Sequence, residues 1–206
     1  MPQRAARVGL LQTVFVDTPI FAILGAPIAV IVAFQHGLPG HAKVTFALMI
    51  VATSLGISLG FHRLFSHRSF ATARPVEWTL MILGCMAGQN SPFYWVATHR
   101  THHQHSDHDG DPHSPHIWAG RRLRLLSGFW HAYFGWLHAN GYNYPRAIVG
   151  DLRSRADLVW IDRHWFGWYA LGLTLPALAG FLIGGTVYDA LIGFLWGGLF
   201  RHFVAL

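Results

Sequence analysis

Histidines are concentrated between Phe61 and His113, in two clusters on either side of one apolar stretch. The second cluster contains His99, His102 and His103, which share one face of a helix because they are spaced i, i+3 and i+4. Three imidazoles on one helical face are costly to pack without a shared partner. This spacing therefore predicts a metal site.

The first cluster is the pair His62 and His67, which lie five positions apart in the chain. In an ideal α-helix that spacing corresponds to about 140° of rotation, so the pair would bind one metal only if the helix ended between them. Neutral imidazoles suit iron, copper, nickel or zinc, and the spacing alone does not choose among these metals. Because both clusters lie at the edge of apolar runs, we expect both to bind metal at the membrane surface.

The remaining histidines have weaker claims to a metal. Four follow the second cluster in a polar stretch and are expected to be solvated or to support the ligands, namely His105, His108, His113 and His116. Two flank a short turn on the other side of the membrane, His36 and His41. The last four are expected at the membrane surface or in packing contacts, namely His131, His138, His164 and His202.

The composition indicates a membrane protein. Hydrophobic residues make up 52% of the chain and charged residues 12%, below the roughly 25% of soluble proteins, and the mean hydropathy is positive. The net charge of +6 does not indicate a nucleic-acid partner, because the basic residues gather at the ends of apolar runs and form no stripe. The single cysteine, Cys85, is expected to pack among its apolar neighbours.

Four apolar runs predict transmembrane helices. They cover residues 18–34, 44–61, 165–183 and the run that starts at Ala190. Residues 76–97 carry polar side chains that disfavour a full crossing, and this segment predicts an interfacial or re-entrant helix over the metal site. We therefore expect an all-α, polytopic membrane protein in which residues 1–206 form one domain.

The basic residues predict the orientation of the chain in the membrane. Of the 15 lysines and arginines, only Lys43 lies in a connection assigned to the far side. The others lie before the first span, between the second and third spans, or at Arg201. The positive-inside rule therefore places both histidine clusters on the cytoplasmic side of a multi-pass integral membrane protein.

Three strings resemble the membrane fatty-acid desaturases, specifically the acyl-CoA delta-9 class. They read Gly-Phe-His-Arg-Leu-Phe-Ser-His-Arg-Ser-Phe at residues 60–70, Trp-Val-Ala-Thr-His-Arg-Thr-His-His at 95–103 and Asp-Gly-Asp-Pro-His-Ser at 109–114. The resemblance implies a di-iron enzyme that uses O2 and two electrons to insert a cis double bond into an acyl chain. It also implies a long-chain acyl-CoA or acyl-lipid substrate and an external electron donor, either ferredoxin-like or a haem protein with its reductase.

Carried over residue by residue, the resemblance assigns iron binding to the two histidine boxes, which are His62 and His67, and His99, His102 and His103. It places Gln89 and Trp95 along a kinked acyl tunnel near the irons. Ala97 and Thr98 depart from the charged pair that animal relatives carry near the coenzyme A end.

The same family pattern includes a third His-x-x-His-His box and one further histidine, which residues 1–206 do not contain. We therefore expect an incomplete di-iron ligand set and an inactive chain when these 206 residues are expressed alone. Two other functions fit the residues, namely a fatty-acid hydroxylase or alkane-oxidising relative, and a membrane metal-binding remnant without catalysis. The histidine boxes and the Gly-Asp-Pro-His segment favour the desaturase.

Overall fold

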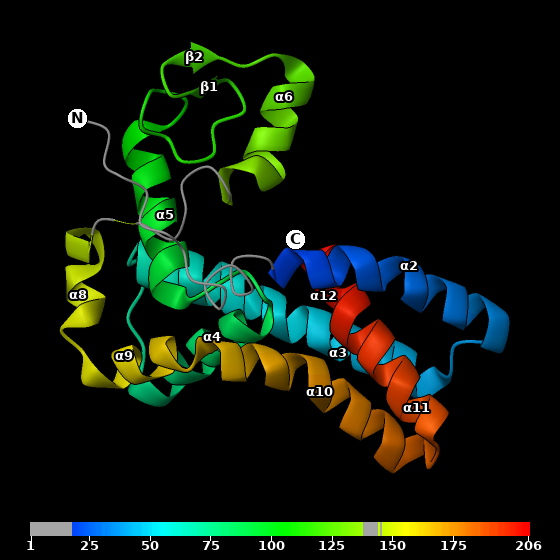
Figure 1. Cartoon of the computed structure of the whole chain (residues 1–206). Helices are drawn as coiled ribbons and strands as arrows, with labels where there is room; N and C mark the ends of the chain where they lie inside the picture. Colours follow the sequence, from blue (N-terminus) through cyan, green and yellow to red (C-terminus); the bar gives the residue numbers. More distant parts are fainter. Residues whose placement is uncertain (1–17, 138–143, 145) are drawn as a thin grey trace.

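The computed structural model describes residues 18–137, 144 and 146–206, and within these ranges most of the chain is helical (Figure 1). The strands of the described part are β1 (Ile117–Trp118) and β2 (Arg121–Arg122), which pair antiparallel with Ile117 opposite Arg122. This arrangement confirms the predicted all-α fold class. The assignment of residues 1–206 to one domain stays a prediction.

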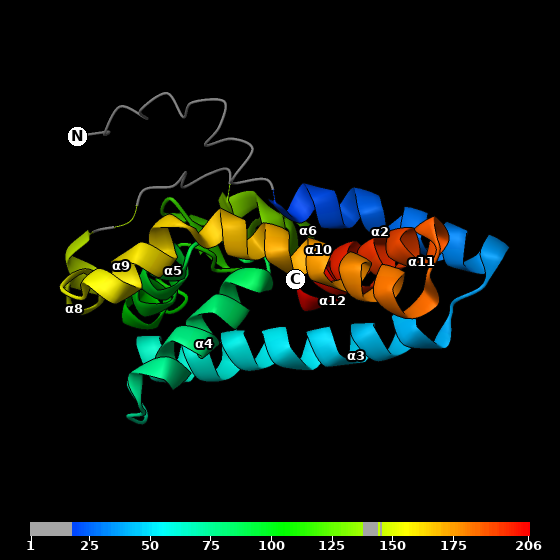
Figure 2. The same cartoon turned by 90° about the horizontal axis from the view of Figure 1, so that it is seen from below.

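Three helices are long and apolar enough to cross a membrane. They are α2 (Thr18–His36), α3 (Gly40–Leu55) continued by η1 (Gly56–Ser66), and α10 (Trp165–Gly184). The axes of the three helices are nearly parallel in both views, with the chain of α3 and η1 running opposite to that of α2 and α10 (Figures 1 and 2). They contain the first three predicted runs, and at most 28% of each apolar window is buried, as expected for helices that face lipid.

The fourth predicted span forms a continuous helix but is not among these three. It consists of α11 (Val187–Ile192), η4 (Gly193–Phe200) and α12 (Arg201–Ala205). Arg201 and His202 interrupt its apolar character, and both side chains are 0% exposed. This helix packs against α2, α3 and α10, so it buries polar groups inside the bundle as well as apolar ones.

Residues 76–97 do not form the single interfacial or re-entrant helix that the sequence predicted. α4 (Arg74–Met86) ends at a loop in which Gly88 and Asn90 have φ angles of +84° and +73°, and α5 (Pro92–His105) begins after it. α4 packs against η1, α3 and α10. The predicted packing of Cys85 is confirmed, because its side chain is fully buried there.

Shorter elements complete the end of the bundle that carries the histidines. They are α6 (Leu125–Trp130), η2 (His131–Gly135), η3 (Arg146–Val149), α8 (Gly150–Arg153) and α9 (Ala156–Arg163). One apolar core joins η1, α4, α5, α8, α9 and α10 at this end. It contains Phe61, which directly precedes His62, and Ala97, which lies two residues before His99. The core therefore supports both histidine clusters from behind.

Gly56 allows the backbones of η1 and α4 to touch. A Cβ atom at Gly56 would lie 2.2 Å from the backbone nitrogen of Gly84, and one at Gly84 would lie 2.4 Å from the ring of Phe61. Small residues at such crossings let membrane helices pack by close van der Waals contact. This crossing fixes the position of η1 and hence of His62.

We expect Gly56→Ala to lower the free energy of unfolding by about 1–3 kcal/mol, because α4 must move away to make room for the methyl group. Gly167→Ala in α10 is the matched control, since nothing lies within 4 Å of a Cβ atom at that position. The control should be neutral or slightly stabilising. Thermal unfolding of both variants in one detergent measures the difference, and equal midpoints would contradict the close packing at Gly56.

Candidate metal centre and adjoining cavity

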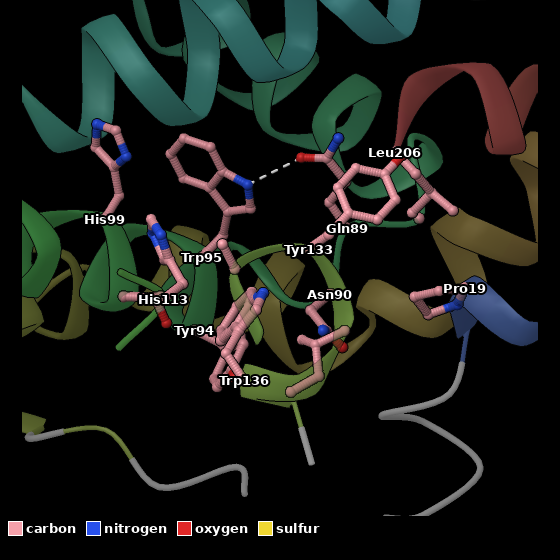
Figure 3. A pocket seen from close by; sticks show the side chains of 14 residues that line it. Pro19, Gln89, Asn90, Tyr94, Trp95, His99, His113, Tyr133, Trp136 and Leu206 are labelled. Carbon is pink, nitrogen blue, oxygen red and sulfur yellow. Dashed lines mark hydrogen bonds between the residues drawn. The ribbon is translucent and has the colours of Figure 1, made fainter. Parts of the chain in front are cut away.

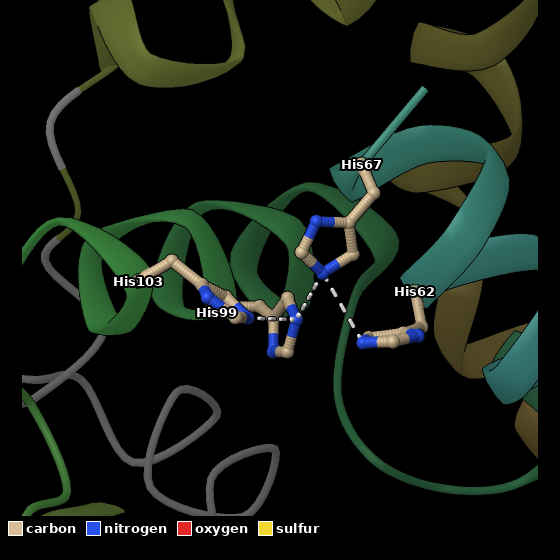
Figure 4. A group of neighbouring side chains, drawn as sticks. All are labelled: His62, His67, His99 and His103. Carbon is tan, nitrogen blue, oxygen red and sulfur yellow. Dashed lines mark hydrogen bonds between the residues drawn. The ribbon is translucent and has the colours of Figure 1, made fainter. Parts of the chain in front are cut away.

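Four of the five predicted metal-binding histidines converge where η1 meets α5 (Figure 4). The Nε2 atom of His67 lies 3.2 Å from that of His62 and 3.1 Å from that of His99. The Nε2 atom of His103 lies 3.1 Å from that of His99. The ligand atoms of all four lie within 4.8 Å of one another. Metal–nitrogen bonds are about 2.1 Å long, so one ion can contact several of these atoms.

The winding of η1 brings His62 and His67 to the same face. η1 is a π-helix, and the backbone N–H of His67 donates to the carbonyl of His62, five residues earlier, at 3.0 Å. Such i→i+5 bonding is rare in proteins and is frequently found at functional sites. From the spacing, the pair was expected to share one metal only if the helix ended between the two histidines. The helix does end between them, at Ser66, and the wide π-turn before that residue places His67 beside His62.

Two acceptors hold the N-terminus of α5. The Oγ atom of Ser91 accepts the backbone N–H of Tyr94 at 3.3 Å, and the carboxylate of Asp162 in α9 accepts that of Phe93 at 2.9 Å. These N–H groups have no partner inside the helix, so the two acceptors fix its starting point. Burial raises the pKa of Asp162, although the hydrogen bond from Phe93 opposes the shift.

Arg100 ties the middle of α5 to the end of η1. Its guanidinium donates to the carbonyls of Phe65 and Ser66, and it makes two hydrogen bonds of 2.8 and 2.9 Å to the carboxylate of Asp151. Arg68 forms a second ion pair with Asp151 at 2.8 Å. Burial raises the pKa of Asp151, but the hydrogen bonds and charges of the two arginines outweigh this effect and lower the pKa to about 2.

His102 does not converge with the other four histidines. Its Nδ1 atom donates to the two carboxylate oxygens of Asp111 at 3.0 and 2.9 Å, and its ring stacks on that of His113 with centroids 4.5 Å apart. Burial raises the pKa of Asp111, but hydrogen bonds from the N–H of Asp107, from His102 and from the N–H of His113 outweigh it and lower the pKa. His102, Asp111 and His113 form a second group able to hold a metal.

Asp111 was missed by the reasoning from histidine spacing. The sequence did contain one indication, because Asp111 belongs to the Gly-Asp-Pro-His segment that contributes to the family resemblance. No function was predicted for Asp111 from that segment. His113 was expected either to be solvated or to support the metal ligands. It is only partly exposed and its ring stacks on His102, which fits the supporting role. His105, His108 and His116 are exposed, and His131 and His202 are buried, as expected. His138 lies outside the described residues.

The clustered imidazoles of α5 are electrically neutral near pH 7. Burial, together with repulsion from the neighbouring histidines, lowers the pKa of His99 to about 3. The same causes lower the pKa of His103. A neutral imidazole keeps a lone pair for a metal, whereas a protonated one does not. His99 and His103 can therefore bind a transition metal without first losing a proton.

A cavity of about 240 Å³ adjoins the histidine cluster (Figure 3). His99 belongs to the cluster and also lines the cavity. Gln89 and Trp95, the two predicted substrate-binding residues, line the same cavity. The indole N–H of Trp95 donates to the side-chain oxygen of Gln89 at 3.0 Å, and its ring stacks on His99 with centroids 4.9 Å apart. The other lining residues are largely apolar or aromatic, among them Pro19, Tyr94, Tyr133, Trp136, Leu137 and Leu206.

Comparisons with known proteins agree on one family. A family model described as "Fatty acid desaturase" matches residues 39–206. The chain is 40% identical over 158 residues to a hex-5-enoyl acyl-carrier-protein acetylenase of Moorena producens, covering 76% of this chain and 49% of the relative. It is 35% identical over 184 residues to the sn-1 stearoyl-lipid 9-desaturase of Anabaena variabilis, covering 86% and 63%. The chain thus spans between about half and two thirds of the length of these relatives.

We expect Asp151→Asn to lower the free energy of unfolding by roughly 1–3 kcal/mol at pH 7, because the hydrogen bonds to Arg100 lose their ionised acceptor. The folded-state pKa of Asp151 is depressed to about 2, so this stabilisation is present above the unfolded pKa of about 4 and is lost as the pH falls toward 2. The gap between wild type and variant should therefore stay constant from pH 7 to 5 and shrink below about pH 4.

Arg68→Gln is the matched control for this prediction. The Arg68 side chain is 65% exposed and that of Arg100 is 12% exposed, so solvent screens the pair from Arg68 far more. Unfolding midpoints measured across pH compare the three proteins. A larger loss in Arg68→Gln than in Asp151→Asn would show that the exposed pair, and not Arg100, holds these elements together.

Proposed function

The chain belongs to the fatty acid desaturase family, and we propose that its activity is the O2-dependent insertion of a cis double bond into a fatty acyl chain in the membrane. The position of His99 carries this proposal, because this residue belongs to the histidine cluster and also lines the cavity. No amino-acid side chain is suited to breaking an unactivated methylene C–H bond, so the oxidant must come from a bound metal.

Iron is the metal that we propose for the cluster, and neutral imidazoles are donors that iron accepts. Bound iron would supply the oxidant that, with O2 and two electrons, removes two hydrogens from neighbouring methylenes. Two irons are proposed, with part of their ligand set supplied by the five box histidines, His62, His67, His99, His102 and His103. Asp111 accepts the Nδ1 proton of His102, which fixes its ring and leaves Nε2 for a metal.

The cavity is proposed to hold the reacting part of the acyl chain. Its aromatic and apolar lining suits methylene groups, and the hydrogen bond between Trp95 and Gln89 holds two lining side chains in one arrangement. Gln89 also donates to the carbonyl of Ala205 at 2.5 Å, so its position is set from two sides. Holding the chain in one register beside the histidines would expose one pair of methylenes to the oxidant.

The proposed partners follow from this chemistry. The substrate is a long-chain acyl group carried by coenzyme A or a lipid, the co-substrate is O2, and an external ferredoxin-like or haem protein supplies electrons. The names of the relatives mention an acyl-carrier protein, a lipid and coenzyme A, so the carrier differs among them. The distribution of lysine and arginine supports a cytoplasmic location for the histidine-bearing end.

We expect His99→Ala to lower the iron content of the purified protein at least about tenfold, because the variant lacks one of the proposed iron ligands. Loss of a hydrogen-bond partner behind a ligand already weakens metal binding by about tenfold or more, and loss of the ligand itself should weaken it further. His105→Ala is the control, since His105 is exposed on the same helix and lies outside the cluster. Elemental analysis gives iron per chain.

Gas chromatography of fatty acids from a desaturase-deficient host that expresses the complete gene product tests the reaction itself. Unsaturation that persists in His99→Ala would remove this residue from the proposed centre.

Trp95→Phe should keep the ring against His99 but lose the N–H that binds Gln89. We expect less desaturation and a less uniform double-bond position, because the cavity wall loses one fixed contact, while the iron content stays unchanged. Double-bond positions are measured by mass spectrometry of derivatised fatty acids. An unchanged product pattern would show that this hydrogen bond does not position the substrate.

A further inference from the structure

The helix that runs from α6 into η2 exposes an apolar face outside the bundle of spans. Leu125, Leu126, Phe129 and Trp130 are 88%, 81%, 65% and 61% exposed. Their spacing of i, i+1, i+4 and i+5 places them on one side of the helix. Large apolar side chains gathered in this way on a surface mark a contact with a membrane or another molecule.

The other side of this helix is fixed to the protein, so the apolar face cannot turn inward. A Cβ atom at Gly128 would collide with the carbonyl oxygen of Pro115, which shows how closely the helix packs there. His131 is buried, and its ring centroid lies 5.2 Å from that of Trp118. Trp136, just beyond η2, lines the cavity. This segment therefore forms a wall between the cavity and the surroundings of the protein.

Basic residues precede the apolar face directly. Arg121, Arg122 and Arg124 are exposed, and residues 121–137 contain no aspartate or glutamate. Arginines beside an apolar helical face are typical of helices that lie in the surface of a membrane with anionic lipids. The apolar side chains then enter the acyl region, and the guanidinium groups reach the phosphates.

The position of α6 fits such a location. Measured along the shared axis of the three spans, α6 lies at nearly the same height as the first turns of α2 in both views (Figures 1 and 2). Its axis runs across that direction, and Figure 1 shows it to one side of the bundle. A helix placed beside the bundle, at the end of a span, lies where headgroups meet acyl chains.

We propose that the α6 face, formed by Leu125, Leu126, Phe129 and Trp130, is embedded in the membrane surface, and that Arg121, Arg122 and Arg124 bind anionic lipid phosphates. A water-soluble acidic protein would match the arginines but would leave the apolar side chains without a suitable environment. A lipid leaflet matches both features. This inference does not depend on the proposed enzymatic activity.

Fluorescent labels at single cysteines test the proposal in the intact protein. Cys85→Ala removes the native thiol, and Leu126→Cys places the label on the α6 face. Ser154→Cys, at an exposed polar position after α8, is the aqueous control. Leu48→Cys, which replaces a side chain 66% exposed on α3, is the acyl-chain reference. All three are reconstituted in nanodiscs that contain phosphatidylglycerol and phosphatidylcholine.

We expect the label at position 126 to emit at shorter wavelength than that at 154, to be quenched by lipids with brominated acyl chains, and to be quenched several-fold less by iodide. Replacing the three arginines by glutamine, or all phosphatidylglycerol by phosphatidylcholine, should reduce lipid quenching at 126 but not at 48. Equal iodide quenching at 126 and 154 would place the face in water. Protection from both quenchers would mean that protein covers it. Either result overturns the proposal, and lipid quenching unaffected by loss of the charges overturns the role of the arginines.

Discussion

Arg100 makes the contact on which the candidate site depends. Its guanidinium reaches the last carbonyls of η1, the carbonyl of Ile148 and the carboxylate of Asp151, so it joins α5 to η1 and to the segment formed by η3 and α8, which are distant in the sequence. Only 12% of this side chain is exposed, and a charge so poorly solvated must be paired and hydrogen-bonded to be tolerated. The residue before it is His99. Fixing Arg100 therefore fixes the distance between α5 and the pair His62 and His67 at the end of η1.

The rest of the protein divides into a lipid-facing part and a packed part. The apolar windows of the spans bury 28% or less of their residues within the protein, whereas the main apolar core lies at the end that carries the histidines. Buried polar side chains also occur between the helices, where Arg201 donates to the carbonyl of Gly197 and the hydroxyl of Tyr169 lies 3.1 Å from Nδ1 of His202. Lipid offers no hydrogen bonds, so these groups must find partners inside the protein.

The cluster and the cavity are mechanically linked through Trp95. Its ring stacks on His99, while its N–H is held by Gln89, whose own amide binds the end of α12. A shift of α12 or of the loop after α4 would therefore move a ring in contact with the proposed metal ligand. Another part of the cavity wall comes from residues 132–137, which follow α6, and we assign the outer face of α6 itself to the membrane surface. The cavity thus lies between the histidines and the lipid.

The sequence by itself determined the helical class, the first three apolar helices and the five histidines proposed as metal ligands, because hydrophobic run length and histidine spacing are local properties of the chain. Only the tertiary structure decided how those histidines divide. The π-winding of η1 aligns His62 with His67, and the loop after α5 brings Asp111 to His102, turning it away from the cluster. The break between α4 and α5, by contrast, has a local reason, since Gly88 and Asn90 adopt positive φ angles, Ser91 caps α5 and Pro92 begins it. Hydrogen bonds between segments far apart in sequence leave no periodic signal along the chain, so spacing cannot reveal them.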